Sequence, residues 1–233
     1  MTVTVTTSWD DGHVLDLRLA DLLAGHGLPG TFYIAPRNVE IDAGLRLSAE
    51  QMRELADRFE IGGHTLNHVR LPSVPLDVAD AEIRDGKAFL EDILQVTVDS
   101  FCYPGGAYGR EHVGLVRRAG FTVGRTVKRW VTAEPADLLQ VGTTAHAYRH
   151  LKDLGPLARL YRRHPLRAVS RFRNWDDLAI DQFDAIATAG GVFHLWGHSW
   201  EVDANHDWER LERVMGHIAG RPGVHYVTNG SLS

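Results

Sequence analysis

Short runs of β-branched and aromatic residues alternate along the chain with longer stretches in which apolar residues recur at helical spacing. Valine and threonine alternate over residues 3–8, which predicts a strand. Leucines at helical spacing predict helices over residues 13–25 and 47–59, and Ser48 with Gln51 forms a capping box at the start of the second. The same patterns predict further strands at residues 30–34, 96–103, 121–126, 139–144, 191–196 and 224–228, and further helices at residues 76–94, 111–119, 181–189 and 207–219.

This alternation favours a parallel sheet with crossover helices, in a single domain that spans residues 1–233. A (β/α) barrel and an open doubly wound sheet both fit the pattern, and both gather functional side chains at the carboxyl ends of the strands. Residues 147–177 do not follow the alternation. They are rich in arginine and interrupted by proline, and we expect a loop with a short helix there.

Composition narrows the class of protein. Of the 233 residues, 44% are hydrophobic, which is enough for a substantial core. The formal net charge is −5 with both signs interspersed, so the chain lacks the basic footprint of a nucleic-acid-binding protein. Cys102 is the single cysteine, which excludes an intrachain disulfide. The N-terminus lacks a signal-peptide pattern and no apolar run reaches the length of a membrane span, so we expect a cytoplasmic protein.

Two adjacent carboxylates, Asp10 and Asp11, follow the first predicted strand and precede Gly12. Like charges this close raise one pKa unless a cation lies beside them. A bound metal ion would resolve that conflict. An acidic turn after a strand is the simpler alternative, because Asp-Gly is ordinary turn chemistry.

The spacing of His64 and His68 adds to the argument for a metal. On a helical turn, residues four apart lie on one face, within reach of one ion. Together with the aspartate pair they make a His-His-Asp set with open coordination positions. Such a set suits a divalent ion, above all zinc, with cobalt, nickel, iron and manganese as alternatives.

Four segments, taken in order, resemble the polysaccharide deacetylases, the NodB-homology group of carbohydrate esterases (carbohydrate esterase family 4 type). They are residues 8–12 with Asp-Asp-Gly, residues 60–68 with both histidines, residues 81–106 with a terminal Tyr-Pro-Gly-Gly, and residues 195–198 with a terminal histidine. Each motif alone is unspecific, whereas their common order is specific. The resemblance spans most of the chain and implies a distorted (β/α) barrel of about seven parallel strands.

The resemblance also implies roles for individual residues. Asp10 is the expected general base and His198 the expected general acid. The backbone N–H near Gly105 is expected to help hold the oxyanion. The implied metal ligands are Asp11, His64 and His68.

Two features depart from the family pattern. Cys102 stands where the third family motif usually has an arginine that holds the base, and Arg125, at the end of the next strand, is a candidate replacement. The aspartate-tryptophan pair of the fourth motif has no aligned counterpart, although Trp130 lies nearby in sequence and Glu201 is a candidate support for His198.

Four more side chains follow or end predicted strands and are expected to contact substrate or line the pocket. They are Tyr103, His146, His194 and Trp196. If residues 191–198 are extended, His194, Trp196 and His198 share one face. A hydrogen-bonded core position is the alternative for His194.

These observations together predict a metal-dependent hydrolase that removes an N-acyl group, most simply N-acetyl, from a small or oligomeric amino-sugar substrate. The first alternative is a deformylase or a cyclic imide or ureide amidohydrolase on the same fold. The second is an inactive carbohydrate-binding protein, which the two departures from the family pattern would favour.

Overall fold

The structure, a computed structural model, describes residues 2–232. Within these residues, eight strands form one sheet in the order β5-β4-β3-β2-β1-β7-β6, with β8 also paired to β1. All of the strand pairs are parallel. The central strand β1 (Val3–Asp11) pairs with β2 (Thr31–Ile34) and β7 (Gly191–Gly197). The other strands are β3 (Glu60–Gly63), β4 (Ser100–Cys102), β5 (Val123–Arg125), β6 (Ala145–His146) and β8 (Val224–Tyr226).

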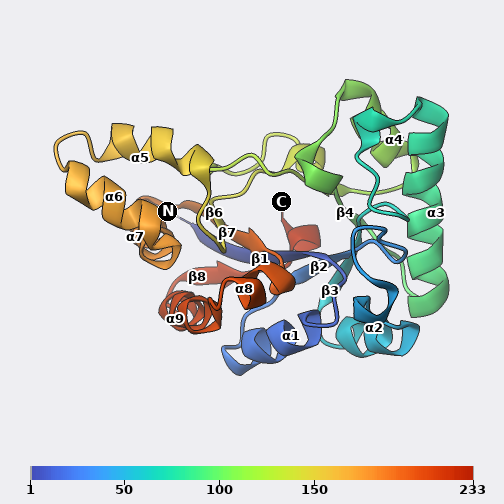
Figure 1. The fold of residues 1–233 in the computed structure, drawn as a ribbon, viewed down its shortest axis with the longest axis horizontal. Helices are drawn as coiled ribbons and strands as arrows, with labels where there is room; N and C mark the ends of the chain where they lie inside the picture. Colours follow the sequence, from blue (N-terminus) through green and yellow to red (C-terminus); the bar gives the residue numbers. More distant parts are fainter. Residues whose placement is uncertain (1, 233) are drawn as a thin grey trace.

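The seven-strand path is curled, as the distorted barrel interpretation predicts (Figure 1). Residues 141–146 connect its two ends. The Val141 N–H donates to Gly124 O on β5, and the Thr144 N–H donates to His194 O on β7. The predicted strand at residues 139–144 is therefore displaced, because residues 138–140 form a 3₁₀ turn and the strand itself is Ala145–His146.

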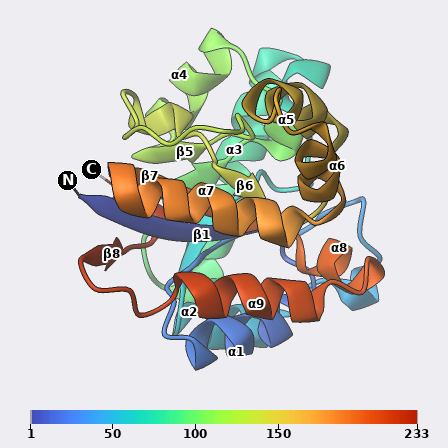
Figure 2. The ribbon, with the colours of Figure 1, turned by 90° about the vertical axis from the view of Figure 1, so that its left-hand side faces the viewer.

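Helices cover the outside of the sheet, with α3 and α4 beside β4 and with α1, α2 and α9 below β1 (Figures 1 and 2). Their bounds are α1 (Asp16–Gly25), α2 (Ala49–Ala56), α3 (Leu76–Leu94), α4 (Arg110–Arg118), α5 (Leu154–Leu160), α6 (Pro165–Arg173), α7 (Trp175–Ala189), α8 (Ser199–Ala204) and α9 (Trp208–Ile218). Short 3₁₀ helices, η1 to η6, occupy Ala43–Leu45, Leu71–Ser73, Pro104–Gly106, Leu138–Gln140, Leu151–Asp153 and Asn229–Ser231.

Helix α3 has the predicted bounds, and the capping box of Ser48 and Gln51 is present at the start of α2. No helix within residues 2–232 is long and apolar enough to cross a membrane.

Besides the displaced strand at residues 139–144, three further sequence expectations were wrong in the extent or the kind of element. The strand expected at residues 96–103 is limited to Ser100–Cys102. Residues 147–177 hold α5, α6 and the start of α7, where we expected a loop with one short helix. The histidine pair does not lie on a helical turn, because Thr65 and His68 have φ values of 61° and 64°. A left-handed loop, rather than helical periodicity, brings the two imidazoles together.

Candidate active site

A pocket of about 340 Å³ opens at the carboxyl ends of the strands. The predicted site residues in its wall are Asp10, Asp11, His64, His68, Gly105, His146, Trp196 and His198. The two aspartates are the last two residues of β1. His64 and His68 follow β3, His146 ends β6, and His198 directly follows β7. Parallel strands end at one edge of a sheet, which is why segments so distant in sequence meet here.

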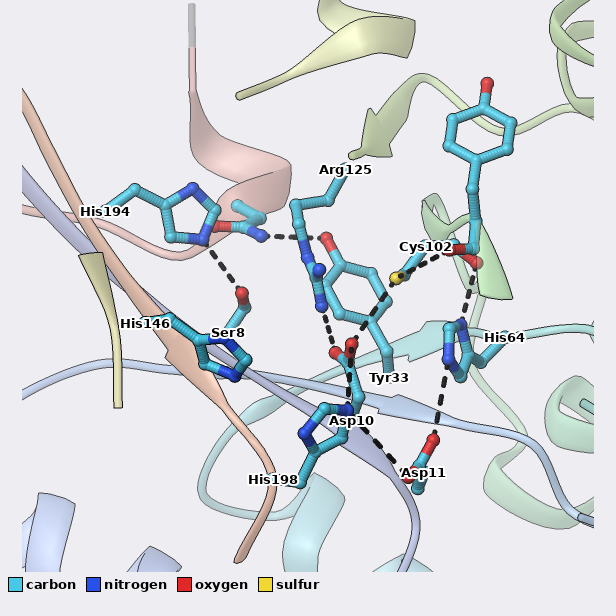
Figure 3. A network of polar contacts seen from close by, with 12 residues as sticks. Ser8, Asp10, Asp11, Tyr33, His64, Cys102, Arg125, His146, His194 and His198 are labelled. Carbon is cyan, nitrogen blue, oxygen red and sulfur yellow. Dashed lines mark hydrogen bonds and ion pairs between the residues drawn. The ribbon is translucent and has the colours of Figure 1, made fainter. Parts of the chain in front are cut away.

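Arg125 pairs with Asp10, the residue expected to be the base (Figure 3). Its guanidinium Nη2 donates to Asp10 Oδ1, and neither side chain is more than 4% exposed. Cys102 and Arg125 are direct partners across β4 and β5, and the Cys102 thiol lies 3.7 Å from Asp10 Oδ2. The family usually has its arginine at the position of Cys102 on β4, whereas here the guanidinium comes from Arg125 on the neighbouring strand β5. This contact confirms the prediction that Arg125 replaces the usual arginine.

The charges around Asp10 decide its protonation. Burial alone would raise the pKa of Asp10, but Arg125, with His64 and His198, outweighs burial and lowers that pKa to about 2. Burial raises the pKa of the Cys102 thiol well above its ordinary value. At neutral pH the site therefore presents a carboxylate beside a neutral thiol.

Asp11, His64 and His68 form the set that fits a metal ion. Asp11 Oδ1 is buried without a hydrogen-bond partner and lies 3.6 Å from His64 Nε2 and 3.2 Å from His68 Nε2. Ligand atoms about 2.1 Å from a tetrahedral ion lie about 3.4 Å apart, so these separations fit. His64 Nδ1 donates to Cys102 O (2.8 Å), which leaves Nε2 unprotonated. Burial and the neighbouring His68 lower the pKa of His64 to about 4, so the imidazole is neutral.

The backbone conformation at Asp11 and a hydrogen bond from Trp200 orient the Asp11 carboxylate towards His64 and His68. Asp11 has a φ of 88° and Gly12 one of 75°, in the left-handed region that L-residues rarely adopt. The Trp200 indole N–H donates to Asp11 Oδ2 (2.9 Å), so Oδ1 is the oxygen that faces the two histidines. Strain of this kind is concentrated where a surrounding structure fixes a functional side chain.

On the opposite side of the pocket, Glu201 orients His198. Its Oε2 accepts a hydrogen bond from His198 Nδ1, and His198 Nε2 then lies 3.9 Å from both Asp10 Oδ2 and Asp11 Oδ2. Burial opposes the charged imidazole, but the bond to Glu201 and the two aspartates outweigh it and raise the pKa of His198 to about 9. His198 is therefore protonated at neutral pH.

Support for Glu201 comes from a second chain of contacts. His146 Nε2 lies 3.5 Å from Glu201 Oε2, while Arg129 donates to His146 Nδ1 (3.3 Å) and thereby fixes the hydrogen on Nε2. Asp153 accepts bonds from the Arg129 guanidinium and from the Trp130 indole N–H. An aspartate and a tryptophan thus support His198 indirectly, from segments that are not adjacent in sequence.

The Trp196 ring packs between Arg125, which contacts Asp10, and His146, which contacts Glu201. His146 stacks on its ring at a centroid distance of 3.9 Å, and the Arg125 guanidinium lies 4.5 Å from the ring centroid. The indole therefore fixes the supports of Asp10 and of His198 relative to each other. Its own exposure of 6% leaves only an edge for substrate.

Two predicted pocket residues are core residues instead. His194 is 1% exposed, and its ring nitrogens bond Ser8 Oγ (2.8 Å) and Gly142 O (3.1 Å), which is the hydrogen-bonded core position given above as the alternative. Tyr103 is fully buried, and its hydroxyl donates to Leu139 O (3.0 Å). Gly105 lies in the pocket wall with φ +60°, and a β-carbon there would lie 3.1 Å from Arg70 Nε.

The described part of the chain contains two further groups of ligand-type side chains besides Asp11, His64 and His68. One combines Asp10, His64 and Cys102, and the other combines His146, His198 and Glu201. The first would need a thiolate from a thiol whose pKa burial has raised, and the second would occupy His198, the residue expected to donate a proton. The Asp11 group is the one with a buried acceptor that has no other partner.

The sequence profile of the polysaccharide deacetylase family matches residues 2–124, more than half of the chain. The chain belongs to the polysaccharide deacetylase family. The family segment carries Asp10, Asp11, His64 and His68, whereas His198 and Glu201 lie beyond it. A comparison with curated protein sequences finds no match.

Solved structures agree on the fold of this polysaccharide deacetylase family member. A Mycobacterium smegmatis protein assigned as a polysaccharide deacetylase superposes with a TM-score of 0.72 at 15% identity, over 97% of this chain and 87% of that chain. The Xyl-CE4 domain of a xylanase from the hindgut metagenome of Trinervitermes trinervoides gives 0.59 at 12% identity, over 98% and 88%. The Streptococcus pyogenes deacetylase PplD, in complex with acetate, superposes with a TM-score of 0.55 at 22% identity. The match covers 59% of this chain and only 62% of the length of PplD.

Sequence reasoning missed Arg129 and Asp153, which support the site from behind Glu201. Arg129 and Asp153 lie in irregular segments, and no periodic pattern marks them.

Proposed function

We propose that this chain is a metal-dependent hydrolase that removes an N-acetyl group from an amino-sugar substrate. One observation carries the proposal. An ionised carboxylate, Asp10, and a protonated imidazole, His198, face each other beside a His-His-Asp set whose buried Asp11 oxygen has no partner. Amide hydrolysis needs this pairing, because one group must take a proton from water and another must give one to the leaving nitrogen.

A divalent ion held by Asp11, His64 and His68 would act as a Lewis acid towards the amide carbonyl and would lower the pKa of water. Asp10 takes the proton of the attacking water at Oδ2, because Arg125 occupies Oδ1. The low pKa that Arg125 imposes keeps Asp10 ionised and able to act as an acceptor across neutral pH.

His198 completes the reaction from the other side. As the C–N bond breaks, Nε2 gives its proton to the amine, and acetate and the free amine leave. Glu201 keeps Nδ1 protonated and fixes the direction of Nε2. The proton that Asp10 accepted can return to His198 over the 3.9 Å that separates Asp10 Oδ2 from Nε2, which restores the starting state.

Aromatic side chains at the mouth of the pocket support a sugar as the substrate. Tyr148 and Trp200 line it, and phenol and indole rings offer apolar faces to pyranose rings. We propose an N-acetylated saccharide in the cytoplasm as the substrate. The alternative of an inactive binding protein loses its main argument, because Arg125 now supplies the missing guanidinium contact to Asp10.

The test combines metal analysis with acetate release from a panel of N-acetylated saccharides, on the full chain. We expect one metal ion per chain and acetate release for the wild type, and loss of both for His64→Ala. His225→Ala, at an exposed histidine outside the pocket, is the control and should match the wild type. Asp10→Asn should keep the metal and lose turnover.

Two results would contradict parts of the proposal. Metal binding without acetate release would direct the search to formyl, imide and ureide substrates on the same site. Absence of metal from the wild type after loading with zinc, cobalt or manganese would refute the metal-dependent mechanism.

A further inference from the structure

Helices α5 and α6 form a hairpin at one edge of the molecule (Figure 1). The surface of this hairpin differs in charge and in exposed apolar side chains from the rest of the chain. Residues 149–173 hold eight arginines and lysines and one aspartate, a net charge of +7 in a chain whose total is −5. The rest of the chain therefore carries −12. A positive charge concentrated on one hairpin indicates a negatively charged partner.

Most of these cations are free to meet such a partner. Arg167 and Arg171 pair with Asp181 on α7. The other hairpin cations make no ion pair within residues 2–232. They are Arg149, Lys152, Arg159, Arg162, Arg163 and Arg173, and apart from the local contact of Arg149 with the Phe172 ring their charges face solvent.

The same hairpin exposes apolar side chains. Eleven large hydrophobic residues are exposed within residues 2–232, and five of them lie between residues 151 and 169. Leu166 is 85% exposed, Leu151 74% and Leu160 60%. A groove of about 330 Å³ between the helices adds an apolar surface lined by Leu154, Val169 and Phe172. Exposing an apolar surface of this kind to water is unfavourable in free energy, so we expect a partner to cover it.

We propose that the α5–α6 hairpin docks on an anionic phospholipid surface. Lipid headgroups neutralise the arginines, and the acyl region receives the exposed leucines, which is the behaviour of basic amphipathic helices at a membrane interface. A second copy of this chain is disfavoured in a symmetric contact, because two hairpins of +7 would face each other. Nucleic acid would pair with the arginines but would leave the leucines in water.

Docking here would have a consequence for the pocket. The hairpin continues directly from the pocket wall, where His150 and Lys152 contribute to the lining. A membrane bound at α5 and α6 would therefore lie beside the entrance, and substrates attached to or gathered at the membrane surface would reach it.

Vesicle cosedimentation of the full chain tests the proposal. Vesicles of phosphatidylcholine are compared with vesicles that also contain phosphatidylglycerol, at low and high salt. We expect binding only to the phosphatidylglycerol vesicles, weakened by salt. Each arginine near an anionic surface contributes about a fivefold factor, so Arg159→Gln/Arg162→Gln/Arg163→Gln should weaken binding about 100-fold.

Matched variants separate charge, apolar insertion and misfolding. Arg110→Gln/Arg117→Gln/Arg118→Gln removes the same charge from exposed positions on α4 and should leave binding unchanged. Leu160→Gln/Leu166→Gln should weaken binding, whereas Leu45→Gln/Leu76→Gln, at other exposed leucines, should not.

Four outcomes would overturn the proposal. The wild type could stay in the supernatant with phosphatidylglycerol vesicles. The α4 control could lose as much binding as the hairpin variant, or the Leu160 and Leu166 substitutions could have no effect, which would indicate a general polyanion site. Finally, sedimentation velocity without vesicles could reveal a dimer that the triple arginine variant abolishes, which would assign the hairpin to a second copy.

Discussion

Replacing Arg125 with methionine tests whether this arginine stabilises the proposed base. The side chain is fully buried, and its guanidinium is the cation paired with Asp10. Removal leaves a buried carboxylate without its partner, which typically costs about 3–5 kcal/mol. For a domain of this size, that loss lowers the melting temperature by about 6–20 °C.

A double-mutant cycle isolates the pair. Asp10→Asn/Arg125→Met removes both charges, so no unpaired charge remains buried, and most of the loss seen in Arg125→Met should be recovered. Thermal unfolding followed by circular dichroism, with a chelator present, measures all four stabilities without a contribution from bound metal. Additive effects, to within about 0.5 kcal/mol, would refute the coupling between Asp10 and Arg125.

The pH dependence of stability gives a second readout of the same pair. The pKa of Asp10 in the folded chain, about 2, lies below its ordinary value of 3.8. The ion pair therefore stabilises the fold fully above pH 4, and about 2 kcal/mol is lost as the pH falls towards 2. This part of the acid destabilisation should be absent from the Asp10→Asn/Arg125→Met variant.

Exchanging the two residues across the strand pair tests function. Cys102 and Arg125 are register partners whose side chains both approach Asp10. Cys102→Arg/Arg125→Cys returns the arginine to the strand where the family usually has it and nearly conserves the volume. We expect Arg125→Cys alone to abolish acetate release and the exchange to restore part of it. An exchange variant that folds, binds metal and remains as inactive as Arg125→Cys would show that arginine at β4 cannot replace arginine at β5.

Two further predictions concern the acid and the metal. Glu201→Gln removes the carboxylate that raises the pKa of His198. Because the proposed mechanism needs a protonated His198, the alkaline limb of the pH–rate profile should move to lower pH, and kcat should fall about 10- to 100-fold. An unchanged alkaline limb would exclude His198 as the titrating acid. A divalent ion at about 100 times its Kd should stabilise the wild type by about 2.7 kcal/mol and raise its melting temperature by about 5–11 °C. His68→Ala should lose that rise and Cys102→Ser should keep it, whereas the reverse result would favour the group of Asp10, His64 and Cys102 as the metal site.

Local sequence predicted the elements with strong periodicity. Helix α3 has nineteen residues with one apolar face, and its predicted bounds were correct because periodicity over several turns is unambiguous. Short strands were harder. β4 has three residues and β6 two, and their ends are set by pairing with neighbouring strands rather than by side-chain composition.

The arrangement of His64 and His68 shows where spacing alone misleads. The spacing of four residues predicted proximity correctly but for the wrong reason, since the residues lie in a left-handed loop. Helical spacing is one of several ways to bring two imidazoles together. The backbone that does so here depends on how the segment 64–68 packs against α3, where the Leu66 N–H bonds Glu82 O.

By itself, the sequence determined the fold class, the family and the positions of Asp10, Asp11, His64 and His68, because these residues lie in short motifs at strand ends. The sequence offered Arg125 and Glu201 only as candidates, and the tertiary structure decided that they contact the two proposed proton-transfer residues and what lies behind Glu201. Arg125 is 115 positions from Asp10, and Asp153 acts on His198 only through Arg129, His146 and Glu201. Such contacts depend on strand order and register, which bring distant segments to one edge of the sheet and leave no local pattern along the chain.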